Sequence, residues 1–97
     1  MLALQRQGRI RFHGTCTGEE AAVVGAAAAV RDEDWIFPAL RQVGALFWRG
    51  VPIAKAVAQS IGNALDAARG RQMPCHYSDR GAGVVSWSSC IGTQLPH

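Results

Sequence analysis

The apolar residues of this chain are small, and this limits the core that the chain can form. Hydrophobic residues make up 48% of the 97 residues, but much of that content is alanine, and there are also 11 glycines. Alanine and glycine remove little apolar surface from water, so each buried residue contributes little hydrophobic stabilisation. A chain of this length forms one domain at most. We therefore expect a thin core that depends on partners or on further sequence.

The charged residues and the cysteines exclude several classes of protein. The net charge is +3, but the ten basic residues, nearly all arginine, are dispersed among seven acidic ones, which disfavours a nucleic-acid-binding stripe. Cys16, Cys75 and Cys90 are odd in number and form no C-x-x-C pair, so free buried thiols are favoured over disulfides or structural zinc. No run has transmembrane length, and the first residues lack a signal-peptide pattern. These patterns favour a soluble intracellular protein.

Four segments have the residues typical of helices. The first is 1–7, ended by Gly8, and the second follows a capping-box pattern of Thr17 and Glu20 and ends before the polar cluster 31–34. The second helix is expected to present a face without bulk, formed by Ala21, Val24, Gly25 and Ala28. The third helix is predicted over 39–48. The fourth begins at Pro52 and is closed by Gly62.

Short apolar runs between these helices indicate extended segments. Residues 35–37 and 84–87 are predicted as strands, residues 9–12 as an extended run, and residues 63–82 as a long loop. The combination of short helices and brief strands predicts an α/β architecture.

Three groups of polar residues could take part in chemistry. Arg41, after a predicted strand, could clamp a diphosphate, although a surface arginine on a helix is the simpler interpretation. His13 and His76 could transfer a proton, but hydrogen-bonded loop histidines are more common. The segment 88–94 holds Ser88, Ser89, Thr93 and Gln94, whose oxygens suit a cation or phosphate, or else a helix N-cap.

The order of short motifs along the whole chain resembles one enzyme family. The motifs are RQGRI at 6–10, GEEA at 18–21, DWIF at 34–37, LRQVG at 40–44, RGVP at 49–52, GN at 62–63, GRQMP at 70–74, HY at 76–77, SS at 88–89 and TQLP at 93–96. Together they resemble the alpha subunit of thiamine diphosphate-dependent 2-oxo acid dehydrogenases. The branched-chain (2-oxoisovalerate) type is the closest in character, followed by the pyruvate type.

The resemblance implies roles for individual residues. Arg41 is expected to contact the cofactor diphosphate, and Ser89 is expected to touch the cofactor. Leu40 stands at a cofactor-binding position where the family commonly has a tyrosine that reaches the phosphate. A monovalent-cation loop, with potassium as the candidate ion, matches four positions: Ser88, the Cys90 carbonyl, Thr93 and Gln94. Cys90 stands where the family has a proline.

The resemblance also implies a function and partners. Residues 1–97 would be the N-terminal part of the cofactor-binding domain, truncated at both ends, within a three-layer αβα fold that is mostly helical in this piece. The parent enzyme would decarboxylate a 2-oxo acid oxidatively and transfer the acyl group to the lipoyl group of an acyltransferase component. Its partner would be a beta subunit in a heterotetramer, located in the bacterial cytoplasm or the mitochondrial matrix.

The expected cofactors are only partly accounted for by this chain. The Mg²⁺ that accompanies thiamine diphosphate would be held by a Gly-Asp-Gly motif, which does not occur among the 97 residues. No catalytic residue is therefore assigned, and the isolated chain is expected to be inactive. The alternative function is a non-catalytic helical interaction module that pairs through its alanine and glycine faces.

Overall fold

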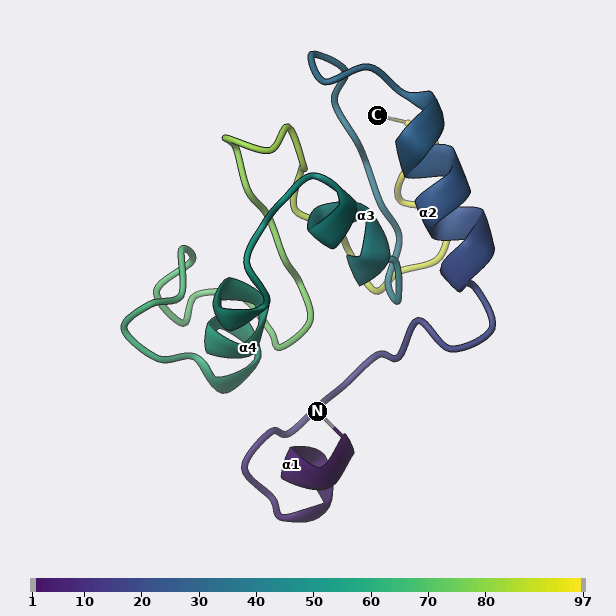
Figure 1. Cartoon of the computed structure of the whole chain (residues 1–97). Coiled ribbons are helices and arrows are strands. Elements are labelled where there is room, and N and C mark those ends of the chain that lie inside the picture. Colours follow the sequence, from purple (N-terminus) through teal and green to yellow (C-terminus); the bar gives the residue numbers. More distant parts are fainter. Residues whose placement is uncertain (1, 97) are drawn as a thin grey trace.

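All regular elements that the structure describes are helices. The structure is a computed structural model and describes residues 2–96. Along this part of the chain the helices are α1 (Leu2–Arg6), α2 (Glu20–Ala29), α3 (Val43–Trp48) and α4 (Ile53–Ile61). Helices α2 and α3 pack against each other, and a linker joins α2 to α1, which lies apart from them (Figure 1). None of the helices in residues 2–96 combines the length and apolarity needed to cross a membrane.

The two predicted strands are adjacent, but they do not form a sheet. Ile36 and Val84 form a single parallel bridge, and Val84 also pairs with Asp79 in an antiparallel bridge. The prediction of strands at 35–37 and 84–87 is therefore wrong in extent, and residues 9–12 contain bends where an extended run was expected. Trp35 and Phe37 remain 54% and 43% exposed. A strand needs a partner along its length, and in residues 2–96 Ile36 has one only at Val84.

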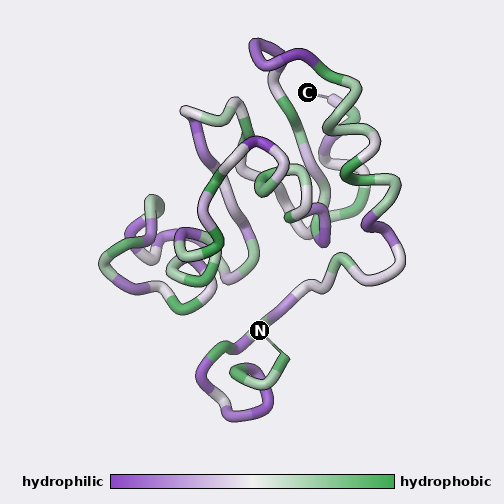
Figure 2. The backbone as a smooth tube through the Cα atoms, in the orientation of Figure 1, coloured by the Kyte–Doolittle hydropathy of each residue, from purple (hydrophilic) through white to green (hydrophobic). Residues whose placement is uncertain are grey.

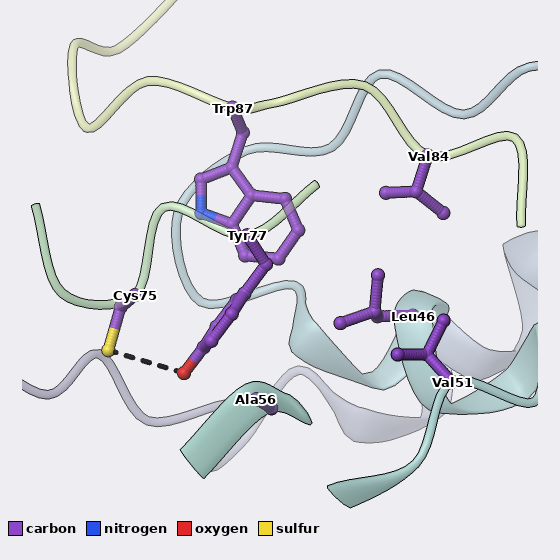
Figure 3. Close-up of a cluster of buried hydrophobic side chains, with 7 residues drawn as sticks. All are labelled: Leu46, Val51, Ala56, Cys75, Tyr77, Val84 and Trp87. Atoms are coloured by element: carbon purple, nitrogen blue, oxygen red, sulfur yellow. Dashed lines mark hydrogen bonds between the residues drawn. The ribbon is translucent and has the colours of Figure 1, made fainter. Parts of the chain in front are cut away.

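Loops supply most of the larger core side chains. The main cluster combines helix residues, one residue of the connection between α3 and α4, and residues of the loop 63–87. Its members are Leu46, Val51, Ala56, Cys75, Tyr77, Val84 and Trp87 (Figure 3). The rings of Tyr77 and Trp87 meet edge to face, with centroids 5.1 Å apart. The Tyr77 hydroxyl reaches Ser60 of α4 at 2.8 Å, and burial raises the pKa of this tyrosine. The long loop is thus ordered by its own aromatic residues.

A second, smaller cluster joins α2 to α3. It consists of Val23, Ala27 and Ala45, which are 7%, 4% and 4% exposed. We expected the face without bulk to let another element approach closely, and this prediction is wrong. Its residues Ala21, Val24, Gly25 and Ala28 are all exposed. Apolar residues follow one another along most of this helix, as the colours of Figure 2 show. The hydrophobic pattern therefore did not distinguish one side of α2 from another.

The predicted helix boundaries are confirmed at some ends and wrong at others. Helix α4 follows Pro52 and ends before Gly62, whose φ of 75° provides the left-handed C-cap. Helix α2 begins at Glu20 without a side-chain cap, because the Thr17 hydroxyl contacts the Thr15 hydroxyl and not a backbone N–H of the helix. Helix α3 begins at Val43, four residues later than predicted, and Arg41 therefore lies in a turn.

Candidate functional site

Arg41 is held in the turn before α3 by three contacts to the segment that precedes α2. Its Nε donates to the Thr15 carbonyl at 2.7 Å, and its Nη2 donates to the Thr17 carbonyl at 2.9 Å. Its Nη1 forms an ion pair with the Glu19 carboxylate at 3.1 Å. The Arg41 side chain is nevertheless 43% exposed. The guanidinium is therefore oriented by its own chain while it remains accessible to a ligand.

The backbone of Arg41 adopts a conformation that arginine rarely has. Its φ is +77°, in the left-handed region, which costs a non-glycine residue about 1–2 kcal/mol. Strain of this kind persists where the surrounding contacts over-determine the conformation, and such residues cluster at functional sites. The two bonds to the Thr15 and Thr17 carbonyls are contacts of this kind. Arg41 is thus a surface residue, as the simpler interpretation expected, but it lies in a turn and not on a helix.

A second arginine, Arg49, forms a similar clamp at the other end of α2. Its Nη1 donates to the Asp32 carbonyl at 2.6 Å, and its Nη2 donates to the Arg31 and Asp34 carbonyls at 2.8 and 2.9 Å. Arg49 is the C-cap of α3 and has an ordinary φ of −75°. Arg41 and Arg49 thus tie both ends of the α2–α3 pair together.

Leu40, beside Arg41, contributes no polar group. Its side chain is partly buried and packs against the main hydrophobic cluster. A leucine has no hydrogen-bond donor, so it cannot make the phosphate contact that a tyrosine would make. At this position the chain offers a cofactor only an apolar surface.

The segment 88–94 forms a closed turn stabilised by its own side chains. The Ser88 hydroxyl accepts a hydrogen bond from the Cys90 N–H at 3.1 Å, and the Thr93 hydroxyl donates to the Cys90 carbonyl at 2.9 Å. Gln94 reaches outside the turn, because its Nε2 donates to the Pro38 carbonyl at 3.2 Å. This bond joins the turn to the segment that leads into Arg41. Ser89 is exposed on the same turn.

The oxygen atoms of this turn are compatible with a monovalent cation. Ser88, Thr93 and Gln94 line a small cavity of about 50 Å³ together with Phe37 and Pro38. Each hydroxyl retains lone pairs beyond the hydrogen bond that it forms, and the Gln94 amide retains its carbonyl oxygen. These neutral oxygen donors suit a hard ion of low charge. Within residues 2–96, no group of three or more His, Cys, Asp or Glu side chains could hold a metal ion.

The two described histidines take structural positions. His76 is buried, and its Nδ1 lies 3.0 Å from the Pro74 carbonyl, which can only accept, so Nδ1 carries the proton. His13 has its Nδ1 3.9 Å from the Cys75 sulfur, and burial lowers the pKa of its imidazole. The interpretation of these residues as hydrogen-bonded loop histidines fits both environments. His97 lies outside the described residues.

The cysteines are free thiols, as expected, but only one of them is buried. Cys75 is 2% exposed, Cys16 is half-buried and Cys90 is exposed. The Cys75 sulfur accepts a hydrogen bond from the Gly14 N–H at 3.4 Å. It therefore anchors the linker between α1 and α2 to the main core.

Sequence reasoning missed two residues of this arrangement. Glu19 was recognised only as part of a motif, and its ion pair with Arg41 spans two segments that the sequence does not connect. Arg49 was likewise recognised only within a motif, yet it forms three hydrogen bonds to backbone carbonyls. Its position directly after α3 was the available signal, since a basic residue near a helix C-terminus is favourable.

Comparison with known proteins places the chain in a family. Residues 1–97 match the family described as Dehydrogenase E1 component. The mitochondrial 2-oxoisovalerate dehydrogenase subunit alpha of Bos taurus is 47% identical over 92 residues, which cover 95% of this chain and 20% of that protein. The alpha 2 subunit of Arabidopsis thaliana is 44% identical over 93 residues, which cover 96% of this chain and 20% of that protein.

A relative from Caenorhabditis elegans, also a mitochondrial 2-oxoisovalerate dehydrogenase subunit alpha, is 46% identical over 92 residues. The chain thus spans about a fifth of the length of the curated relatives that it matches. The match to the family covers all 97 residues. This chain belongs to the dehydrogenase E1 component family.

Proposed function

We propose that this chain is part of the alpha subunit of a branched-chain 2-oxo acid dehydrogenase and contributes to its diphosphate site. The observation that carries the proposal is the conformation of Arg41. The residue keeps a left-handed backbone, and two carbonyls orient its guanidinium, which remains 43% exposed. A preoriented guanidinium is well suited to a phosphate group, because its planar fork can donate two parallel hydrogen bonds.

Thiamine diphosphate is the cofactor that fits this proposal. When bound, it supplies the carbanion stabilisation that decarboxylation of a 2-oxo acid requires. Arg41 would bind a diphosphate oxygen, Ser89 would contact the cofactor from the C-terminal turn, and Leu40 would add only apolar contact. The Mg²⁺ ligands would come from outside these 97 residues, since the chain contains no Gly-Asp-Gly sequence.

The turn 88–94 would hold a potassium ion. The proposed ligands are the Ser88, Thr93 and Gln94 side-chain oxygens and the Cys90 carbonyl. The Gln94 bond to Pro38 supports a coupling between this turn and Arg41, because it joins the two segments directly. An ion that rigidifies the turn would therefore also fix the segment leading to the diphosphate site.

The remainder of the protein would complete the fold and the assembly. Residues 1–97 would form the N-terminal part of a three-layer αβα cofactor-binding domain, in which the bridge between Ile36 and Val84 extends into a parallel sheet. The parent enzyme would pair with a beta subunit in a heterotetramer and pass its acyl group to a lipoyl acyltransferase. The expected location is the mitochondrial matrix, or the cytoplasm if the source is bacterial.

A chimeric enzyme tests this function. The 97 residues replace the matching segment of the bovine alpha subunit, which is then assembled with its beta subunit. We expect the chimera to decarboxylate 2-oxoisovalerate. An assembled chimera without activity on this acid would contradict the proposal and favour the interaction module.

The isolated chain provides a second test. Because it lacks the Mg²⁺ motif, we expect it to bind thiamine diphosphate weakly or not at all, and to release no carbon dioxide from 2-oxoisovalerate. Calorimetry that measured micromolar binding of the cofactor would show that these residues form a complete site by themselves.

A further inference from the structure

We propose that Glu19 competes with the incoming diphosphate for Arg41 and so sets the affinity of the anion site. This inference rests on the proposed function, because it concerns the same arginine. The Glu19 carboxylate lies 3.1 Å from Nη1 of Arg41. A ligand anion that approaches the guanidinium meets a negative charge that already occupies one of its edges.

The contacts of Arg41 divide into two kinds. The carbonyls of Thr15 and Thr17 accept from Nε and Nη2, and these two bonds are sufficient to fix the plane of the guanidinium. Backbone carbonyls carry no formal charge and do not repel a phosphate. Glu19 occupies the remaining nitrogen, Nη1, and it alone among these partners is an anion. Removing its charge therefore leaves the orientation of Arg41 intact.

The exposure of the ion pair allows this exchange. The side chains of Arg41 and Glu19 are 43% and 38% exposed, so either partner can turn away without opening the core. An exposed ion pair of this kind is weak, which means that a diphosphate with several negative charges can displace the single carboxylate. Glu19 would then act as a substitute anion that holds Arg41 until the ligand arrives.

The neighbouring residue Glu20 offers a matched control. Its carboxylate accepts a hydrogen bond from the Gly18 N–H at 2.8 Å, and no ion pair connects it to Arg41. Glu20 is the first residue of α2 and Glu19 is its N-cap, so both carboxylates lie at the same helix terminus. Replacing either one by glutamine removes one negative charge at nearly the same place. The difference between the two variants isolates the contact with Arg41 from the general change in charge.

The experiment titrates inorganic diphosphate into the full 97-residue chain labelled with ¹⁵N. The Nε–H signal of Arg41 reports binding, and this method measures affinities even in the millimolar range. The variants are Glu19→Gln, Glu20→Gln and Arg41→Gln, and thermal unfolding establishes that each of them is folded. We expect Glu19→Gln to bind diphosphate about two- to fivefold more tightly than Glu20→Gln.

The possible outcomes separate the inference from the proposed function. If Glu19→Gln and Glu20→Gln bind with equal affinity, or if Glu19→Gln binds more weakly, Glu19 does not compete for Arg41. If neither the wild type nor Glu19→Gln binds diphosphate, these 97 residues form no anion site at which Glu19 could compete, and the inference is contradicted as well. The Arg41→Gln variant lacks the Nε–H signal, so the Thr17 amide reports its binding of diphosphate. If this variant binds with the same affinity as the wild type, the proposed anion site itself is contradicted, whatever the role of Glu19.

Discussion

The two ends of the α2–α3 pair are tied by the same residue type in two different ways. Arg49 gives its contacts to three backbone carbonyls at residues 31, 32 and 34, and its backbone is unstrained at a φ of −75°. Arg41 donates two hydrogen bonds to carbonyls and forms one ion pair with a carboxylate, and its φ is +77°. The Arg49 end is built for stability, whereas the Arg41 end keeps strain and an exchangeable partner.

This difference suggests a way to distinguish a structural arginine from the proposed ligand-binding one. Neutral carbonyls that surround a guanidinium satisfy its donors without competing with any anion. A carboxylate at one nitrogen would compete with an incoming anion, and a left-handed backbone is costly for an arginine. The comparison therefore predicts opposite sensitivities at the two ends: stability at Arg49 and anion affinity at Arg41.

The largest expected effect is a loss of stability at Arg49. The substitution Arg49→Gln removes hydrogen bonds from a charged donor to the carbonyls of residues 31, 32 and 34. A hydrogen bond of this type contributes up to about 1.5–3 kcal/mol to stability, and partial exposure reduces the contribution of each. We therefore expect the free energy of unfolding to fall by about 2 kcal/mol in total. Urea unfolding of both chains measures the difference. Arg31→Gln, which leaves the backbone carbonyls in place, is the control.

The next effect concerns affinity for the cofactor. In the chimeric enzyme, Arg41→Gln should weaken binding of thiamine diphosphate by about tenfold, because it removes a charge-assisted hydrogen bond to phosphate. Arg49→Gln should leave this affinity unchanged once the protein is folded. Cofactor titration of the decarboxylation rate measures both constants. Equal losses in the two variants would mean that the two arginines have the same role.

Some features of the fold follow from the sequence because single residues determine them. Pro52 and Gly62 mark the ends of α4, since proline fixes φ and glycine accepts a left-handed C-cap. The buried face of α2 could not be found, because nearly all residues of that helix are apolar or small. The strands at 35–37 and 84–87 could not be judged either, since pairing depends on neighbours outside each segment.

The candidate site shows a similar division. The resemblance of the LRQVG motif to the family's phosphate motif identified Arg41, but no sequence pattern indicates that a non-glycine residue has a positive φ. The bonds from Arg41 to Thr15 and Thr17 join residues 26 and 24 positions apart, and they arise only when α2 packs on α3. The role of Glu19 is therefore a property of the folded chain.

Glycine and alanine substitutions test the backbone difference directly. At Arg41 both substitutions remove the clamp, but glycine accepts a φ of +77° without strain, so Arg41→Gly should be more stable than Arg41→Ala by about 1 kcal/mol. At Arg49 the order should reverse, because alanine is compatible with a φ of −75° and restricts the unfolded chain. Thermal unfolding of the four variants measures the two differences. The same order at both positions would contradict the assignment of backbone strain to Arg41 and not to Arg49.

The smallest effect is a pH dependence confined to the Arg41 end. Burial lowers the pKa of His13, so the folded state prefers the neutral imidazole. Below the unfolded pKa of about 6.5 the unfolded chain therefore binds more protons than the folded chain, and stability falls as the pH decreases. His13 precedes Gly14, whose N–H bonds to Cys75, and Thr15, whose carbonyl holds Arg41. Protonation should thus loosen the segment that orients the guanidinium.

Hydrogen exchange can localise this effect, with protection corrected for the intrinsic pH dependence of exchange. Between pH 7 and pH 5.5, the amides of residues 14–17 should lose protection, while those of residues 31–34 at the Arg49 end keep theirs. His13→Phe removes the titrating group and should abolish the difference between the two ends. If both ends lost protection equally, or if the variant behaved like the wild type, another group would control the response. A loss confined to residues 14–17 would make the orientation of Arg41, and with it anion binding, weaker in acid.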